Sequence, residues 1–261
     1  MIRADASRLR RLSLLGIPLA NIEAPALNAL IVEAAEQRRR LSISFVNHHS
    51  MVTMRQAPHL ARDLQDLDVV GADGIAVVMA SRLFRRPGLP GRISADLVGP
   101  GLLASMEAKG LRLYLLGGEP GVAEAAAGNI LQKYPRLHIA GTHHGFARTP
   151  EEKARMIAAI NATRPEVLWI GLGAPLQERW IAEHGNAVDV PVLMTCGGML
   201  DQTARRLDYY PRWAYRLRLN WLYRLADEPR RLWRRYTVEL AEFGAMLLAR
   251  EWARRGGRQD G

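Results

Sequence analysis

The 261-residue sequence contains a single cysteine, Cys196. One cysteine excludes a disulfide within the chain and argues against a cysteine-rich zinc site. The sequence also lacks any apolar run of the ~20 residues that a membrane-spanning helix needs. The short apolar stretch at residues 12–20 is interrupted by Pro18 and followed by polar residues, so we interpret it as a first strand and turn rather than a signal peptide. We therefore expect the protein to remain in the cytoplasm.

Charge is the most uneven property of the chain. The net charge is +10, but residues 205–258 hold 14 arginines against 6 acids, a net +8, and ten of the 17 aromatic residues. Such a charge predicts a polyanionic partner. Arginine mixed with Trp and Tyr is typical of a segment lying at an anionic membrane surface. A nucleic-acid-binding tail and a solvated basic helix bundle are the alternatives, and no nucleic-acid-binding motif occurs in the chain.

Short apolar runs alternate with helical patterns over the first 200 residues, and a composition change near residue 205 follows. This alternation predicts an α/β fold with a Rossmann-like, mostly parallel sheet flanked by helices. We expect a core at 1–205 and a basic helical appendage at 206–261. The predicted strands are Leu12–Leu15, Leu41–Val46, Asp68–Val70, Leu111–Leu116, Leu137–Ala140, Val167–Gly171 and Val192–Thr195. The predicted core helices are Pro25–Arg39, Leu97–Lys109, Val122–Lys133, Pro150–Thr163 and Leu176–His184.

Polar loops follow several of these strands, where open α/β sheets bind ligands. Asn47 follows one predicted strand, and Asp73 lies in an Asp-Gly pair after the next. Each could be an ordinary turn residue, but the position at a strand end makes Asp73 a candidate catalytic carboxylate. The pairs His48-His49 and His143-His144 have no carboxylate partners at ligand spacing, so no metal site is predicted.

Two glycine-rich turns lead from predicted strands into helices. Gly117 and Gly118 stand in the first, and Gly171 and Gly173 in the second, which continues to Gln177. Such turns can present backbone N–H groups to a phosphate, and the Gln177 amide could bind a sugar or a uracil. Simple packing of a helix against the sheet is the alternative. Neither turn matches the G-x-G-x-x-G or P-loop motif.

Arg224, Arg231 and Arg234 of the tail are spaced by seven and three residues, which would place them on one helix face unless Pro229 bends it. Forked guanidinium donors suit phosphate oxygens. In an enzyme that uses a nucleotide sugar without a metal, such cations would have to stabilise the leaving diphosphate.

Several of these motifs together resemble the WecG/TagA/CpsF family of glycosyltransferases. The resemblance runs from about residue 14 to residue 236, through Leu115–Gly121, Tyr134-Pro135, Gly141–Gly145, Gly171–Trp180 and Trp221–Arg235. It implies an inverting, metal-independent and cofactor-free transferase. The donor would be a UDP-sugar carrying N-acetylmannosamine, its uronic acid or glucose. The acceptor would be a sugar on undecaprenyl diphosphate, at the inner face of the bacterial plasma membrane.

The resemblance also implies roles for individual residues. Asp73 matches the family's base, and Asn47, Arg92 and Gln177 match its donor- and acceptor-binding residues. Arg224, Arg231 and Arg234 match the arginines of its C-terminal appendage, which would close over the diphosphate. The chain departs from the usual pattern in having Phe45 where a Thr is common, Ala95 for Gly, Asn220 for Glu, and Leu200–Arg205 for a different sequence. Because of Phe45, the sequence does not determine the donor sugar. It does not determine the oligomeric state either, and a homo-oligomer is possible. A module that binds a nucleotide or sugar without turnover is the alternative function.

Overall fold

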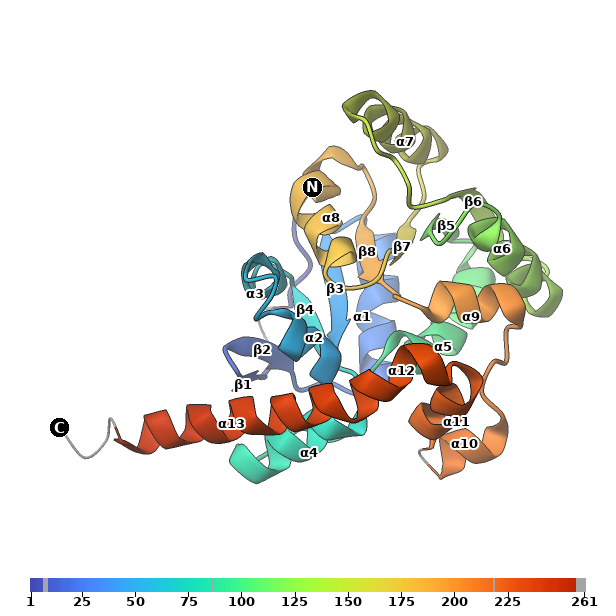
Figure 1. Cartoon of the computed structure of the whole chain (residues 1–261). Coiled ribbons are helices and arrows are strands. Elements are labelled where there is room, and N and C mark those ends of the chain that lie inside the picture. The colour runs from blue at the N-terminus through green and yellow to red at the C-terminus, as the bar shows by residue number, and fades with distance from the viewer. Residues whose placement is uncertain (7–8, 86, 218, 257–261) are drawn as a thin grey trace.

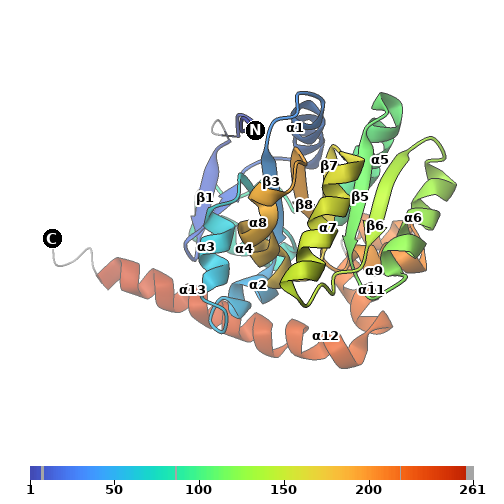
Figure 2. The same cartoon turned by 90° about the horizontal axis from the view of Figure 1, so that it is seen from above.

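The computed structural model describes residues 1–6, 9–85, 87–217 and 219–256. Its centre is a sheet of six parallel strands in the order β4-β3-β8-β7-β5-β6. The strands lie side by side in Figure 2. This sheet confirms the predicted α/β class. Its strands are β3 (Leu41–Val46), β4 (Val69–Ala72), β5 (Arg112–Gly117), β6 (His138–His143), β7 (Val167–Gly171) and β8 (Val192–Thr195).

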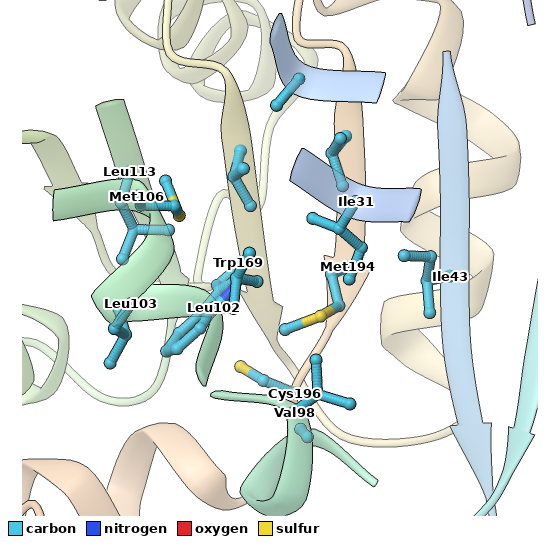
Figure 3. Packing of buried hydrophobic residues seen from close by; sticks show 14 of the residues in the cluster. Ile31, Ile43, Val98, Leu102, Leu103, Met106, Leu113, Trp169, Met194 and Cys196 are labelled. Carbon is cyan, nitrogen blue, oxygen red and sulfur yellow. The ribbon is translucent and has the colours of Figure 1, made fainter. Parts of the chain in front are cut away.

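Helices cover both faces of the sheet, because alternate side chains of each strand point to opposite faces. Leu113, Leu115 and Trp169 pack in the core under α1 (Ala24–Glu36), α5 (Ala95–Lys109), α6 (Val122–Lys133) and α9 (Met199–Arg205). Figure 3 shows Trp169 among Leu102, Met194 and neighbouring residues of this core. The opposite face is covered by α3 (His59–Gln65), α4 (Ile75–Phe84), α7 (Pro150–Thr163) and α8 (Leu176–His184).

The N-terminal strand differs from its prediction. Residues 11–20 form an antiparallel hairpin of β1 (Arg11–Leu14) and β2 (Ile17–Ala20), separate from the six-stranded sheet. Leu15 and Gly16 connect the strands, and both have positive φ, at 51° and 88°. Two consecutive left-handed residues match the twist of a tight hairpin. This hairpin packs its buried leucines into the core on the α3 side of the sheet.

Four helices follow α9 and form the C-terminal part of the described chain. They are α10 (Arg212–Arg216), α11 (Asn220–Asp227), α12 (Pro229–Tyr236) and the long α13 (Val238–Gly256). Helix α13 passes over α2 (His48–Thr53) and beside α4, and its C-terminal half extends past the rest of the molecule (Figures 1 and 2). Among the described residues no helix is both long and apolar enough to cross a bilayer.

A topological switch point lies between β3 and β8. The neighbouring strands send the chain to opposite faces of the sheet, because β3 leads into α2 and α3 while β8 leads into α9. Diverging connections leave a crevice beyond the carboxyl ends of the two strands, which is where open α/β sheets bind their ligands.

Candidate active site at the carboxyl ends of the strands

A cavity of about 770 Å³ occupies this crevice. Its floor comes from the loops after β3, β4 and β8, and its cover from α11, α12 and the start of α13. The volume lies in the range of small-molecule binding pockets. Asn47, Asp73, Arg92, Gly173, Gln177 and Arg224 line it, and so five predicted site residues of the first 205 residues meet one from the tail.

Asp73 follows β4 directly, and its backbone N–H donates to the Val46 carbonyl at 2.8 Å, which ties the ends of β4 and β3 together. Its carboxylate lies 3.5 Å from the Arg92 guanidinium. The side chain keeps 31% of its surface accessible and lines the cavity. Burial raises the pKa of Asp73, against the lowering effect of Arg92 and of a hydrogen bond from Asn47. A base with a raised pKa accepts a proton more readily.

Arg92 is held between two carboxylates. Besides Asp73, it donates to Asp96 at 2.9 Å from the first turn of α5, and the Ser94 hydroxyl donates to the same carboxylate. The backbone next to Arg92 is fixed as well, since the Ile93 N–H donates to the Ala72 carbonyl at 2.9 Å. Arg92 is therefore a cation with its anions already in place, and it fixes the position of Asp73.

Gln177 is held at both ends of its amide. The oxygen accepts from the Gly197 N–H at 3.1 Å, and the nitrogen donates to Glu178 at 2.8 Å. Glu178 is buried and accepts a second bond from Ser44, at 2.7 Å, whose hydroxyl accepts from Thr195. Burial raises the pKa of Glu178. This network joins β3, β8 and α8 beneath the cavity and orients Gln177.

Two arginines of the C-terminal helices enter the cavity without an anion. Arg224 rests on Gly198, where an added Cβ would lie 2.7 Å from the guanidinium. Arg235 lines the cavity from α12. Neither forms an ion pair with any residue that the structure describes, and the Nε of each is buried without a partner there. Burial lowers the pKa of Arg235 and outweighs the opposite effect of Tyr236 and Asp73, whereas at Arg224 burial is outweighed by the opposite effect of Tyr210 and Tyr236 and the pKa is raised.

The structure separates the three arginines that the tail spacing placed on one face. Pro229 begins a new helix after Glu228, so Arg224 lies on α11 while the other two positions lie on α12. This break redirects α12, and Arg234 is exposed on its outer side. The side chain of Arg231 lies outside what the structure describes. Arg235, which the sequence did not single out, is the arginine of α12 that reaches the cavity.

The four glycines of the predicted turns also differ in whether they line the cavity. Gly173 lines the cavity. Gly117, Gly118 and Gly171 pack against one another instead: a Cβ on Gly117 would lie 2.4 Å from the Gly171 carbonyl, and the Gly118 N–H donates to that carbonyl at 3.2 Å. Their lack of side chains allows the ends of β5 and β7 to approach closely.

The residues that a metal could use have other partners. His48 contacts the Arg235 carbonyl at 2.8 Å, and His49 contacts Glu239 at 2.5 Å. The sequence has one Asp-x-Asp, at 66–68, which precedes β4 at the far end of the strand. There Asp68 accepts bonds from Ser42 and pairs with Arg3. Within the described ranges no cluster of three His, Cys, Asp or Glu could hold a metal ion.

Sequence reasoning missed Arg235, Glu178 and Tyr210 as residues of the site. Burial raises the pKa of Tyr210, which lines the cavity, to about 12. Residues 234 and 235 point about 100° apart, so only one of them can face the core, but the sequence of α12 carries no signal that selects Arg235. Glu178 is an acidic residue in the first turn of α8, and its burial comes from the tertiary structure, where Ser44 of β3 donates to its carboxylate.

The fold and this cavity define a Rossmann-like α/β protein with a candidate ligand site at the switch point of its sheet. Residues 12–257 match the model of the glycosyl transferase WecG/TagA/CpsF family, and the chain belongs to this family. It is therefore a glycosyltransferase, as the sequence motifs indicated.

Three relatives carry the same name, N-acetylglucosaminyldiphosphoundecaprenol N-acetyl-beta-D-mannosaminyltransferase. The chain is 34% identical to the protein of Bacillus subtilis (strain 168) over 179 residues, which cover 69% of this chain and 68% of the relative. It is 31% identical to that of Bacillus spizizenii over 180 residues, with the same coverage. For Staphylococcus aureus (strain NCTC 8325) the identity is 30% over 169 residues, 65% of each chain.

Proposed function

We propose that this protein transfers a sugar from a UDP-sugar to a saccharide on undecaprenyl diphosphate, in the synthesis of a cell-surface glycan. The observation that carries this proposal is the position of Asp73 in one cavity with the guanidinium groups of Arg224 and Arg235, which form no ion pair with any residue in the described part of the chain. A base and a diphosphate site are the two elements that glycosyl transfer from a nucleotide sugar requires. The names of the relatives support the lipid-linked acceptor.

Asp73 acts as the base in this mechanism. The acceptor hydroxyl attacks the anomeric carbon of the donor and gives its proton to the Asp73 carboxylate. The new bond joins the acceptor oxygen to the anomeric carbon, while the bond to the donor phosphate breaks and its electron pair leaves with UDP. Direct displacement inverts an α-linked donor to a β-linked product. The β-linkage in the names of the relatives supports this stereochemistry.

Arg224 and Arg235 stabilise the negative charge that develops on the leaving diphosphate. Forked, permanently charged donors in a walled cavity suit this task. Because these two cations come from the tail, residues 206–261 complete a site that residues 1–205 leave open on one side. The same two cations take the place of a divalent metal, so the reaction is metal-independent, and no other cofactor takes part.

The donor sugar is N-acetylmannosamine, its uronic acid or glucose. Phe45 lines the cavity, and its ring fills the space that a side chain at residue 71 would need, since a Cβ on Gly71 would lie 2.7 Å from the ring. An aromatic wall here replaces a hydroxyl that could bind the sugar. Among these three donors, we therefore expect Phe45 to favour a sugar that places an apolar group against the aromatic ring.

The catalytic cycle takes place at the inner face of the plasma membrane, where the protein binds peripherally through its basic tail. UDP release by the purified protein tests the proposal, with a short-chain polyprenyl-diphosphate-linked sugar, a panel of UDP-sugars and a chelator. Acceptor-dependent release with one donor would support it. If the folded protein releases no UDP with any donor and acceptor, the result would support the alternative, a non-catalytic module that binds a nucleotide or sugar.

A further inference from the structure

Helix α4 exposes a row of large apolar side chains. Val77, Val78 and Ala80 face the core, but Ile75 is exposed, Met79 is 62% exposed and Leu83 is 73% exposed. These three exposed residues follow one another at intervals of four. Side chains at this spacing form one continuous stripe. A single exposed Leu is ordinary on a protein surface, whereas an apolar row of this kind marks a contact surface.

Helix α13 carries a second stripe. Its Phe243 and Leu247 are buried, while Leu240, Leu248 and Trp252, spaced by eight and four residues, are exposed. The two helices are joined near the end of α4 by an ion pair of Arg85 with Glu251. Phe84, Leu248 and Trp252 line a groove at this junction. The two stripes therefore belong to adjacent helices, which lie together in Figure 1.

Both stripes begin at the cavity. Ile75 at the start of α4 and Leu240 at the start of α13 line the cavity and are also exposed, as is Trp221 of α11. An apolar surface thus runs from the cavity mouth outward along both helices. Arg82 is exposed on α4 three residues after Met79, whereas Arg250 and Arg254 are exposed on the side of α13 away from Leu248 and Trp252. Exposed arginine beside an apolar stripe, together with the net charge of +8 over residues 205–258, suits the interface of an anionic bilayer.

We propose that the stripes of α4 and α13 together lie in the interfacial layer of an anionic phospholipid bilayer, so that the cavity mouth opens at the membrane surface. Half of this docking surface is then a helix of the core and not of the basic tail. The polyprenyl chain of the acceptor stays in the bilayer while its diphosphate and sugar enter the cavity past Ile75 and Leu240. This last step rests on the proposed function, whereas the membrane contact does not.

Vesicle flotation tests the contribution of α4. The variant Met79→Glu/Leu83→Glu changes two side chains that lie outside the cavity, and Leu131→Glu on α6, where Leu131 is 36% exposed, is the matched control. With vesicles of phosphatidylglycerol and phosphatidylcholine in equal parts, we expect the double variant to lose about tenfold or more in partitioning and the control to match the wild type. Met79→Gln/Leu83→Gln, which adds no charge, should lose less, in the same direction. Unchanged thermal unfolding shows that the variants are folded.

The outcomes separate this inference from the proposed function. The double variant should transfer sugar normally to a short-chain acceptor in solution and poorly to an undecaprenyl acceptor in vesicles. If no acceptor supports transfer even by the wild type, but vesicle binding still depends on Met79 and Leu83, the docking surface stands and the proposed function fails. The role of α4 would be overturned if the Met79/Leu83 variant bound vesicles like the wild type while Leu248→Glu/Trp252→Glu no longer bound them. The role of α4 would also be overturned if the wild type were a dimer and the Met79/Leu83 variant were a monomer that still bound vesicles. The stripe of α4 would then join two copies of the chain.

Discussion

The two sources of positive charge at this site differ in their partners. Arg92, from the core, lies between Asp73 and Asp96. Arg224 and Arg235, from the C-terminal helices, enter the same cavity with no ion-pair partner in the described part of the chain. A buried cation without an anion is costly, and it is retained where a ligand supplies the anion. This difference supports the proposed roles, in which Arg92 holds the base and the other two arginines bind the diphosphate.

Removing the base should have the largest effect. Asp73→Asn keeps the size of the side chain but cannot accept the acceptor's proton, so we expect kcat to fall roughly 10²–10⁴-fold. Donor binding, measured by calorimetry with UDP, should change little, because the cations that bind the diphosphate remain. Near-normal turnover by this variant would remove Asp73 from its assigned role.

Removing an unpaired cation should have the next largest effect. Arg235→Gln and Arg224→Gln should each lower kcat by about 10- to 10³-fold, because each removes a donor that stabilises the leaving group. Arg234→Gln is the matched control one residue away, and it should change kcat by less than about twofold, since Arg234 is exposed. Steady-state kinetics of the three variants test the order. A larger loss at Arg234 than at Arg235 would favour the pattern implied by the family resemblance.

Removing the paired cation should move the pH profile. Arg92 opposes the rise of the Asp73 pKa that burial causes. In Arg92→Gln this opposition is lost, so the pKa of Asp73 rises further and the carboxylate is protonated at a higher pH. Activity falls as Asp73 becomes protonated, and the acidic limb of kcat/KM should therefore shift to higher pH. An acidic limb that stays in place would mean that another group controls it.

The smallest effect is expected at Glu178, beneath the site. Burial raises its pKa in the folded protein, so its proton stabilises the fold below the pKa of an unfolded Glu, and this stability is lost as pH rises through the folded pKa. Glu178→Gln keeps an acceptor for Ser44 and Gln177 but cannot ionise. The free energy of unfolding of the variant, measured by urea titration from below the pKa of an unfolded Glu to above the folded pKa of Glu178, should depend less on pH than that of the wild type. The kcat should change by less than about threefold. A parallel pH dependence in the wild type and the variant would contradict this.

Most of the regular structure could be predicted from sequence. Val122–Lys133, Pro150–Thr163 and Leu176–His184 begin and end where predicted, because caps, prolines and glycines mark their ends locally. The prediction of a lone strand at residues 12–15 was wrong, because residues 11–20 form a hairpin. Nothing in the sequence marks Leu15 as a residue with a left-handed backbone. Helices α2, α3 and α4 were not predicted, because two are only six and seven residues long and α4 is apolar on both sides.

The candidate site was predictable to the extent that it depends on strand ends. Parallel strands bring their carboxyl ends to one edge, which places Asn47, Asp73 and the turn after β7 together, and Gln177 follows that turn as the second residue of α8. The arginines depend on more. Their spacing along the chain predicted a single face, but the break at Glu228 turns α12 independently of α11.

The sequence by itself determined the class of fold, the edge of the sheet that carries the chemistry and the family, because strand periodicity and local motifs are properties of neighbouring residues. Only the tertiary structure decided which arginine of α12 faces Asp73, and that α4 and α13 present their apolar stripes together. Adjacent residues on a helix point about 100° apart. The rotation of α12 against the core is therefore set by distant contacts, such as His48 with the Arg235 carbonyl and His49 with Glu239, which no local pattern encodes.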